Sequence, residues 1–408
     1  MREGIERRLA AILSADVVGY CCGRVVFCNP LNLHLTARAR PVARSRKLTM
    51  MTRDYSHFLP PSGSGGIPKR ERSPLEKLGW KQFFSQQTNP DDLANTPPVR
   101  VVEVHRKGLH VLGDGVDILI PPGPDATVGD WMLYDRHHAS NSTVLQRASL
   151  FERRAPGTGR KRQLIAANVD TVFIVSSCNK DFNIARLERY IVLAFEAEVT
   201  PVIVLTKADL CDDPATYVES ASAISDRVSV EVLNALSHEP IGKLAPWCKP
   251  GQTIAFLGSS GVGKSTLVNA LFNDGVADTA AMREDDSKGR HTTTRRQLHF
   301  TSDGCAVLDT PGMRELQLTD VEAGIADLFA DLVALASRCR FRDCLHDTEP
   351  GCSVQAALEA GDIERSRMAR WAKLVAEERF NSSTLAERKA DDKSLHKMIR
   401  SVQKKKGK

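Results

Sequence analysis

The chain has 408 residues, 42% of them hydrophobic, and carries a formal net charge of +6. This length is sufficient for two or three domains, each with its own core. No apolar run approaches the ~20 residues needed to span a bilayer, and we find no secretory signal peptide, so we expect a cytoplasmic protein with no membrane attachment. Ten cysteines are too few to staple a secreted scaffold of this size.

Residues 1–50 form an extension that differs from the rest of the chain. Glu6–Tyr20 resembles the opening of a class III nucleotide cyclase domain, cut off before any catalytic core. We interpret the extension as a fused fragment or a misplaced start, with Met50 or Met51 as the initiator. Residues 51–95 are predicted to form a linker rich in Pro, Gly and Ser, followed by a short amphipathic element.

Residues 96–155 contain short apolar runs separated by Gly and Pro turns, a pattern typical of a small antiparallel barrel. The strands are expected at Val101–His105, Gly108–Leu112, Val116–Ile120 and Trp131–Leu133. An oligonucleotide-binding fold (OB-fold) is one interpretation of this barrel. The other is a barrel that serves only for packing.

Residues 156–325 change to apolar strands that alternate with helices, which indicates a parallel α/β sheet. Strands are expected at Thr171–Val175, Pro201–Leu205 and Thr253–Leu257, with a helix at Ile184–Ala197. The predicted barrel precedes this domain in the chain. It is therefore nearer in sequence to the base-reading motif described below than to the phosphate loop.

A phosphate-loop pattern, G-x-x-x-x-G-K-S, lies between a predicted strand and a predicted helix. The glycines let successive backbone N–H groups point at phosphates, Lys264 reaches the outer phosphates, and Ser265 offers a hydroxyl to Mg²⁺. A chance glycine-rich turn is the alternative interpretation. The predicted phosphate-binding residues are Gly258, Ser259, Ser260, Gly261, Val262, Gly263, Lys264, Ser265 and Thr266.

A second acidic motif, Asp309-Thr310-Pro311-Gly312, follows another apolar strand. Asp309 is expected to hold Mg²⁺ through water, and the Gly312 N–H to contact the outermost phosphate. One of the three threonines at positions 292–294 is expected to complete the metal shell, and the sequence does not say which. A simple turn is the alternative for this tetrapeptide.

A candidate base-reading motif, Thr206-Lys207-Ala208-Asp209, ends a strand upstream of the phosphate loop. The Asp209 carboxylate can accept hydrogen bonds from guanine N1–H and from the exocyclic amine, a pair of donors that adenine lacks. Asn234-Ala235 follows the next strand, and the Ala235 N–H is expected to contact the guanine oxygen. Because the base motif precedes the phosphate loop, the order implies a circularly permuted domain that binds GTP and GDP.

Residues 326–385 are predicted to form a helical module around Cys339, Cys344, His346 and Cys352, which lie within fourteen residues. Three thiols and one imidazole make a closed tetrahedral set suited to one structural Zn²⁺. Disulfides and plain buried cysteines are the alternatives, and iron also occupies thiolate sites. Residues 386–408 are expected to form a basic tail.

The combined motifs resemble the RsgA family of ribosome small-subunit-dependent GTPases over roughly residues 75–380. Three further segments carry the resemblance: Gln163–Asp170, Arg186–Tyr190 and Glu349–Cys352. Two positions depart from the family pattern, Thr206, where Asn is common, and Asn234, where Ser is usual. The resemblance implies an OB-fold, a permuted GTPase domain and a zinc module. It also implies a factor that binds the immature small ribosomal subunit and its RNA and hydrolyses GTP in late maturation.

The sequence says less about the residues that carry out hydrolysis than about the fold. In many GTPases a glutamine after the D-x-x-G motif positions the attacking water, and here that residue is Met313. His291 is our candidate for positioning water, with RNA contact as the alternative role. A nucleotide-regulated RNA- or ribosome-binding switch with negligible turnover therefore stays open as another function. Basic clusters predict a polyanionic partner, and we expect a monomer.

Overall fold

The computed structural model describes residues 71–105, 107–121, 125–154, 162–272, 296–309 and 318–383. The chain divides into two units, Met1–Lys69 and Arg70–Lys408, and all described residues belong to the second unit. Several predicted features lie outside the described residues: the extension, the linker, His291, the threonines at 292–294, Gly312, Met313 and the basic tail.

Three short helices open the described part of the chain: α2 (Pro74–Lys77), α3 (Gln82–Ser85) and α4 (Pro90–Leu93). A reciprocal capping box starts α2, since the Ser73 hydroxyl accepts from the Glu76 N–H and the Glu76 carboxylate accepts from the Ser73 N–H. Phe84 of α3 is buried and packs with Trp131 and Leu145. The predicted amphipathic element therefore packs against the β-strands that follow it.

The N-terminal β-domain is built on β1, which pairs with neighbours on both of its edges. Its strands are β1 (Pro98–His105), β2 (Gly108–Gly113), β3 (Val116–Ile120), β4 (Trp131–Leu133) and β5 (Thr143–Val144), with the 3₁₀ turn η2 (Ala139–Asn141) before β5. Strands β1, β2 and β3 form an antiparallel meander, and β4 pairs with both β1 and β5. Gly108, at the start of β2, has no room for a side chain, because an added Cβ would lie 2.1 Å from the carbonyl oxygen of Ile120 at the end of β3. The predicted strands are confirmed.

A two-stranded hairpin connects the β-domain to the α/β domain. It consists of β6 (Leu150–Arg154) and β7 (Arg162–Ala167), paired antiparallel. The predicted boundary between residues 155 and 156 falls between these two strands, outside the described residues. The domain boundaries stay predictions.

The centre of the fold is a sheet whose parallel strands are nearly continuous apolar runs, as expected of strands covered on both faces. Its strands are β8 (Thr171–Ser177), β9 (Thr200–Thr206), β10 (Ser229–Val232), β11 (Thr253–Gly258), β12 (Arg296–Phe300) and β13 (Ala306–Asp309). They lie in the order β10-β9-β8-β11-β13-β12, with only β12 antiparallel to its neighbour β13. Among these six strands, those that precede the phosphate-loop strand β11 lie on one side of it and those that follow lie on the other, so the permuted α/β fold is confirmed.

The β-domain joins the far edge of this sheet rather than the half that carries the base motif. Strand β1 pairs antiparallel with β12, with Glu103 opposite Gln297 and Val104 opposite Arg296. Placement in space thus differs from chain order, in which the β-domain is next to the base-reading half. The physical reason is that β12 is an edge strand with unpaired backbone groups, which β1 satisfies.

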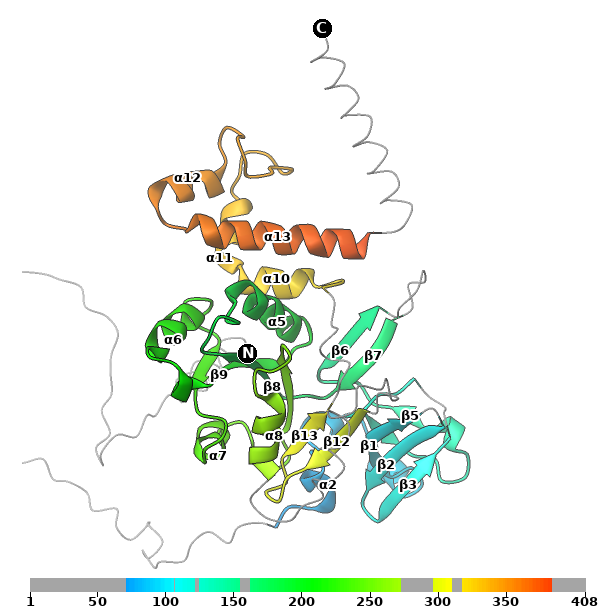
Figure 1. Cartoon of the computed structure of the whole chain (residues 1–408). Helices are drawn as coiled ribbons and strands as arrows, with labels where there is room; N and C mark the ends of the chain where they lie inside the picture. The colour runs from blue at the N-terminus through cyan, green and yellow to red at the C-terminus, as the bar shows by residue number, and fades with distance from the viewer. Residues whose placement is uncertain are drawn as a thin grey trace, which may run out of the picture. The chain divides into compact units, whose positions relative to one another are not determined.

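Helices pack against the central sheet and connect its strands (Figure 1). They are α5 (Ile184–Glu196), α6 (Pro214–Ser222), α7 (Glu239–Leu244) and α8 (Lys264–Phe272), with the 3₁₀ turn η3 (Ala208–Leu210) after β9. Asn183 caps α5, since its side-chain oxygen accepts from the Arg186 N–H at 3.0 Å. The buried face of α5, including Leu187, Ile191 and Ala194, packs into the main core.

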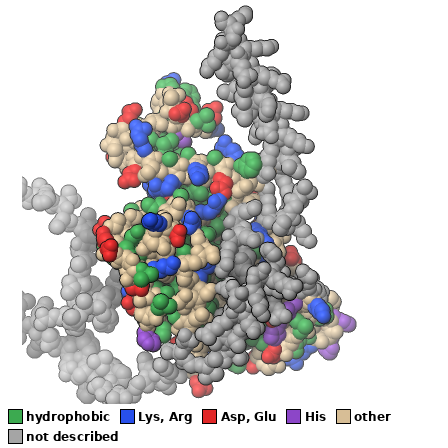
Figure 2. Space-filling model, in the orientation of Figure 1, with side chains coloured by type: hydrophobic (Ala, Val, Ile, Leu, Met, Phe, Trp, Pro, Cys, Tyr) green, Lys and Arg blue, Asp and Glu red, His purple; other side chains and the backbone are tan. Residues whose placement is uncertain are grey.

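Four helices form the C-terminal module: α10 (Glu322–Leu328), α11 (Ala330–Ala336), α12 (Ser353–Ala360) and α13 (Arg365–Ser382). They give this part of the chain the helical character that its sequence predicts. Helix α10 lies directly on α5, where an added Cβ on Gly324 would lie 2.3 Å from the Val192 carbonyl oxygen. Helix α13 is tied to α5 by ion pairs, Glu188 with Arg370 and Arg189 with Glu377. Over these helices Figure 2 shows side chains of both charge signs interspersed.

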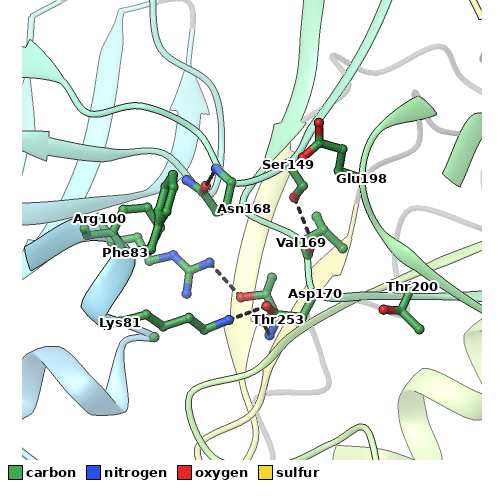
Figure 3. Close-up of a pocket in the computed structure, with 13 residues that line it drawn as sticks. Lys81, Phe83, Arg100, Ser149, Asn168, Val169, Asp170, Glu198, Thr200 and Thr253 are labelled. Carbon is green, nitrogen blue, oxygen red and sulfur yellow. Dashed lines mark hydrogen bonds and ion pairs between the residues drawn. The ribbon is translucent and has the colours of Figure 1, made fainter. Parts of the chain in front are cut away.

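The starts of β8 and β11 meet the N-terminal helices and β1 around a cavity of about 230 Å³ (Figure 3). Arg100, 1% exposed, donates to the Thr253 hydroxyl at 2.7 Å and to the Leu78 carbonyl. Asp170 accepts from the Thr253 N–H at 2.8 Å and pairs with Lys81. Burial lowers the pKa of Arg100 to about 10. These polar contacts fasten the N-terminal helices and β1 to the amino ends of β8 and β11.

No helix among the described residues is long and apolar enough to cross a membrane.

Candidate functional site

The predicted nucleotide motifs all follow parallel strands of the central sheet. Because parallel strands end at the same edge, the loops after β8, β9, β10, β11 and β13 lie together, and we call this the motif edge. Gly258 pairs with Val175, and Ser177 pairs with Thr206. Residues 83 and 29 positions apart in the chain thus become neighbours at the edge where ligands bind in open α/β sheets.

The phosphate loop requires its glycines for two different reasons. Gly258 has φ +147°, and an added Cβ would lie 2.4 Å from the Val175 carbonyl oxygen, so β8 leaves no room for a side chain. Gly261 and Gly263 have φ +79° and +98°, in the region that L side chains rarely adopt. The loop therefore bends as the sequence pattern predicts. Helix α8 begins immediately after it, at Lys264.

Lys264 holds its ammonium group over the loop. Its Nζ donates to the carbonyl oxygens of Gly258, at 2.9 Å, and Ser259. Ser265 is exposed and Thr266 is half-buried at the start of α8, while Leu267 is fully buried and anchors the helix in the core. The first turn of α8, which contains Lys264, Ser265 and Thr266, therefore lies at the motif edge beside the phosphate loop.

Thr206 connects the base motif to the phosphate loop, a role that sequence reasoning missed. This residue is fully buried, and its hydroxyl donates to the Val262 carbonyl oxygen at 2.6 Å, with the Ser176 carbonyl oxygen at 3.2 Å. Its side chain also lies 3.6 Å from the position of an added Cβ on Gly263. The departure from Asn therefore keeps a polar side chain that links the end of β9 to the phosphate loop.

The remaining base-reading residues lie on the turns after β9 and β10. Lys207 has φ +58°, a left-handed conformation, and precedes the turn η3, which leaves Asp209 exposed. The Asn234 side-chain oxygen accepts from the Leu236 N–H at 2.9 Å, which fixes the turn that contains Ala235. Strands β9 and β10 pair in parallel, so the two turns are neighbours at the motif edge.

The metal-binding half of the predicted site is only partly described. Asp309 is the last residue of β13 and so reaches the motif edge. Gly312, His291 and the three threonines lie outside the described residues. Basic side chains also lie near one another on the β6–β7 hairpin and β12: Arg153 lies on β6, Arg162 lies on β7, and Arg296 donates to the Leu164 carbonyl oxygen of β7.

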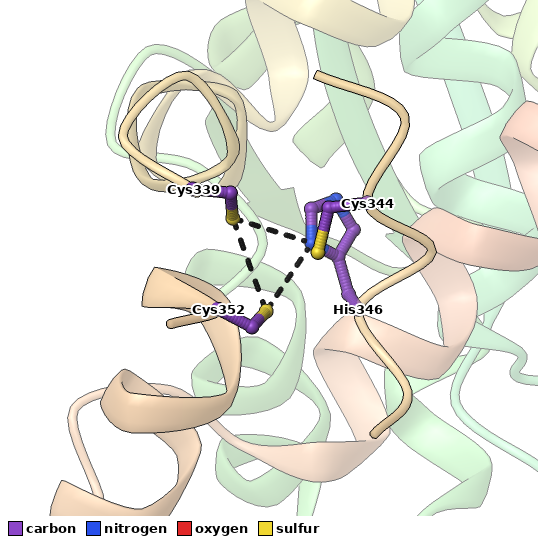
Figure 4. A group of neighbouring side chains, drawn as sticks. All are labelled: Cys339, Cys344, His346 and Cys352. Carbon is purple, nitrogen blue, oxygen red and sulfur yellow. Dashed lines mark hydrogen bonds between the residues drawn. The ribbon is translucent and has the colours of Figure 1, made fainter. Parts of the chain in front are cut away.

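The predicted metal ligands form one compact cluster in the C-terminal module (Figure 4). The Cys339 and Cys352 sulfurs lie 3.8 Å apart, and the His346 Nδ1 lies 3.6 Å and 3.5 Å from them. The ligand atoms of all four residues, Cys344 included, lie within 4.8 Å of one another. A tetrahedral Zn²⁺ with ordinary bond lengths requires about 3.8 Å between sulfurs and about 3.6 Å between sulfur and nitrogen. The donor set therefore fits zinc in both chemistry and spacing.

The surrounding residues hold this cluster in place. The Glu349 carboxylate accepts from the N–H groups of Leu345 and Asp347, each at 2.9 Å, and so closes the ligand loop. Burial lowers the pKa of His346, which favours the neutral imidazole that binds metals. Burial raises the pKa of the Cys344 thiol to about 11, so a bound metal would displace its proton. The sequence indicated Glu349 only as part of the family resemblance. In the structure its carboxylate holds the backbone of the ligand loop through these two hydrogen bonds.

Residues 144–319 match the family model described as RsgA GTPase. The chain is 50% identical over 333 residues to small ribosomal subunit biogenesis GTPase RsgA 2 of Vibrio parahaemolyticus, covering 81% of this chain and 93% of that protein. It is 50% identical over 316 residues to small ribosomal subunit biogenesis GTPase RsgA of Mesorhizobium japonicum, covering 76% of this chain and 91% of that protein.

The fold has a similar relative among solved structures. The crystal structure of YjeQ from Thermotoga maritima has a TM-score of 0.52 and 28% sequence identity, covering 69% of this chain and 97% of that one. The family model, the identity to curated relatives over most of their length and the permuted strand order agree. On this evidence the chain belongs to the RsgA GTPase family.

Proposed function

We propose that this chain hydrolyses GTP and acts in the biogenesis of the small ribosomal subunit, the role that the names of its relatives give for those proteins. The observation that carries the proposal is the convergence of the motif-bearing ends of β9, β10, β11 and β13 at one sheet edge, in a chain of this family. A cytoplasmic location and a monomeric state belong to the proposal.

In this proposal, the base and the phosphates are held by different loops of the motif edge. Asp209 accepts two hydrogen bonds from guanine, and the Ala235 N–H donates to the guanine oxygen. The phosphate loop and Lys264 bind the phosphates. Ser265, Asp309 through water and one of the threonines at 292–294 would hold Mg²⁺, which would neutralise the phosphate charge, and the Gly312 N–H would contact the outermost phosphate.

Water activation is assigned to His291 or to the ribosomal partner. Met313 stands where many GTPases have a water-positioning glutamine and cannot make that hydrogen bond. Hydrolysis by the chain alone should therefore be slow. If His291 positions water, His291→Ala lowers stimulated turnover without changing nucleotide affinity, and unchanged turnover would remove His291 from the mechanism.

The C-terminal module is proposed to hold one structural Zn²⁺ through Cys339, Cys344, His346 and Cys352, and to bind ribosomal RNA together with the β-domain. Helix α5 supports a link between this module and the nucleotide site. It follows β8, which ends at the motif edge, and its Glu188 and Arg189 form ion pairs with residues of α13. Loss of the outermost phosphate is proposed to weaken the hold on the subunit. Equal affinity for the subunit with GDP and with a non-hydrolysable GTP analogue would contradict this coupling, because a ligand shifts an equilibrium only through differential affinity.

The activity is tested by steady-state GTP hydrolysis with the purified full chain, alone and with small ribosomal subunits. Large subunits and ATP are the controls. Stimulation by small subunits only, with GTP only, is the expected result. Tight guanine-nucleotide binding without stimulation would instead favour the nucleotide-regulated binding switch, to which the Met313 departure also points.

A further inference from the structure

A groove along helix α13 exposes apolar surface in the C-terminal module. Its volume is about 590 Å³, and residues of α10, α11 and α13, which pack together, line it (Figure 1). The apolar side chains of the lining are Ile325, Ala326, Val333, Trp371 and Val375. Val333 is 38% exposed although its side chain is entirely apolar. A surface of this kind favours an apolar partner.

Two polar groups of the groove have no partner among the described residues. The Trp371 Nε1 is buried without a hydrogen-bond acceptor, and the exposed Glu322 carboxylate forms no ion pair. A buried N–H without an acceptor is destabilising, and an unpaired carboxylate attracts cations. Glu378 also lines the groove, with Arg379 as its one cation. A suitable occupant therefore combines apolar side chains with positive charge and hydrogen-bond acceptors.

The chain itself continues from the end of this groove. Ser382 and Ser383 line it, and Ser383 is the last described residue, so residues 384–408 begin there. We call these residues the C-terminal segment. It contains nine Lys or Arg and three Asp or Glu. Its net positive charge is thus opposite to that of the groove, where carboxylates outnumber cations.

The apolar residues of the C-terminal segment have helical spacing. Leu395, Met398, Ile399 and Val402 follow the i, i+3, i+4, i+7 pattern that indicates one apolar face. Residues 384–394, which connect this face to α13, reach at most roughly 36 Å when extended. From Ser383 back to Trp371, α13 covers about 18 Å. The connection is therefore long enough for the apolar face to reach any part of the groove.

We propose that the apolar face of residues 395–402 docks in the groove of its own chain. A short connection gives the segment a high effective concentration at the groove, so modest contacts are sufficient to hold it. Docking covers the apolar surface and brings backbone oxygens and basic side chains to Trp371 and Glu322. It also holds the lysines at 404–406 beside the C-terminal module. The docking does not depend on the proposed function.

The first test uses Trp371 as the probe in the full chain. The four tryptophans are replaced by 5-fluorotryptophan, and Trp371→Phe identifies the Trp371 resonance in the fluorine NMR spectrum. Leu395→Asp should shift this resonance and leave the other three unchanged, because it undocks the segment without altering the fold. Leu385→Asp is the matched control, since it makes the same change outside the apolar face, and all four resonances should stay as in wild type.

The second test changes the groove and leaves the C-terminal segment untouched. Trypsin cuts after Lys397 and Arg400 only when the segment is undocked, so the cutting rate reports the undocked fraction. Val333→Asp should raise this rate about tenfold or more over wild type. Leu119→Asp, which changes an exposed leucine of β3, should leave the rate unchanged.

Two results would overturn the inference. One is a Trp371 resonance that is the same in wild type and Leu395→Asp, or a cutting rate that is the same in Val333→Asp and Leu119→Asp. The other is a wild-type Trp371 resonance that moves on dilution to its position in Leu395→Asp, because the occupant would then be the segment of a second copy. A Trp371 resonance independent of concentration is the expected result.

Discussion

The motif edge and the Cys/His cluster are both candidate ligand sites, but they are built in opposite ways. The cluster takes its four ligands from one stretch between α11 and α12, and their sulfur and nitrogen atoms surround a space of zinc size. The motif edge takes its residues from loops after five strands, and Asp209 and Ser265 are exposed there. A closed donor set suits a permanent structural metal, whereas an open edge suits a ligand that enters, reacts and leaves.

The difference predicts that damage to one site leaves the other intact. Variants in the cluster should lose metal and stability but keep nucleotide affinity. Variants at exposed positions of the motif edge should lose nucleotide affinity but keep the metal. The two regions meet at the ion pairs between α5 and α13, so a variant there is expected to affect both regions.

The largest effect is expected from Cys352→Ser, because Cys352 is both a proposed metal ligand and the cap of α12. Metal content, measured by atomic emission, should fall from about one zinc per chain to nearly none. GDP affinity should stay within about threefold. Cys211→Ser, which changes a half-buried cysteine outside the cluster, should keep its zinc. Retained metal in Cys352→Ser would show that this sulfur is not a ligand.

Arg370→Met should be the most destabilising change at the junction of the two regions. Arg370 donates to both carboxylate oxygens of Glu188, each at 2.9 Å, and the Glu188 side chain is fully buried. Leaving that charge unpaired should cost about 3–5 kcal/mol in urea unfolding at neutral pH. Glu188→Gln, which removes the charge instead, should cost much less.

The pH dependence of that variant has a definite sign. Burial already raises the pKa of Glu188 above its ordinary value, against the opposing effect of Arg370. Without Arg370 the folded-state pKa rises further, so the folded state takes up a proton at a higher pH than the unfolded state does. The destabilisation should be complete above the folded-state pKa and shrink as the pH falls through it. A defect that does not change between pH 7 and pH 5 would exclude this explanation.

Lys264→Ala tests the motif edge alone. Loss of a charged hydrogen bond to phosphate should weaken nucleotide binding about 100-fold, with unchanged zinc content. The matched control is Lys249→Ala, an exposed lysine before the other end of β11. Titration with a fluorescent GDP measures both variants, and equal affinity for them would contradict the assigned role of Lys264.

Thr206→Val should have a smaller and mixed effect. The change leaves the buried Val262 carbonyl without its donor, which should cost about 1–3 kcal/mol of stability. Nucleotide affinity should fall as well, since the loop loses its link to β9. Thr206→Ser keeps the hydroxyl and serves as the control. The link would have no importance if the two variants bound GDP and melted alike.

The smallest effect is expected from Arg189→Met. Its ion pair with Glu377 joins the same two helices, but both side chains are about one-third exposed. Such pairs contribute less than about 1 kcal/mol. A loss of unfolding free energy comparable to that of Arg370→Met, measured by the same urea titration, would contradict this prediction. It would mean that the exposure of an ion pair does not predict its contribution to stability at this junction.

Much of both sites could be predicted from sequence because their signals are local. The cluster spans fourteen residues with ligand spacing, and the phosphate loop is a continuous pattern between a strand and a helix. The permuted order of the sheet followed from the order of the motifs along the chain. The identities of the site residues at the motif edge stay predictions, although the structure brings the described ones to one edge.

The contacts that could not be predicted join residues far apart in the chain. Thr206 and Val262 are 56 positions apart, and Arg370 and Glu188 are 182 positions apart. The pairing of β1 with β12 likewise depends on which edge strand needs a partner, which no local pattern encodes. Such contacts are fixed by tertiary packing, so the sequence showed the residue types but not their partners.

The central claim is that separate loops of a permuted sheet assemble one guanine-nucleotide site, and Asp209 tests it most directly. The measurement is the affinity of wild type and Asp209→Asn for GDP and for xanthosine diphosphate, which has an oxygen in place of the exocyclic amine. The account predicts that wild type prefers GDP and that Asp209→Asn loses about tenfold or more of that affinity and prefers the xanthine nucleotide. Unchanged preference for GDP in Asp209→Asn would contradict it.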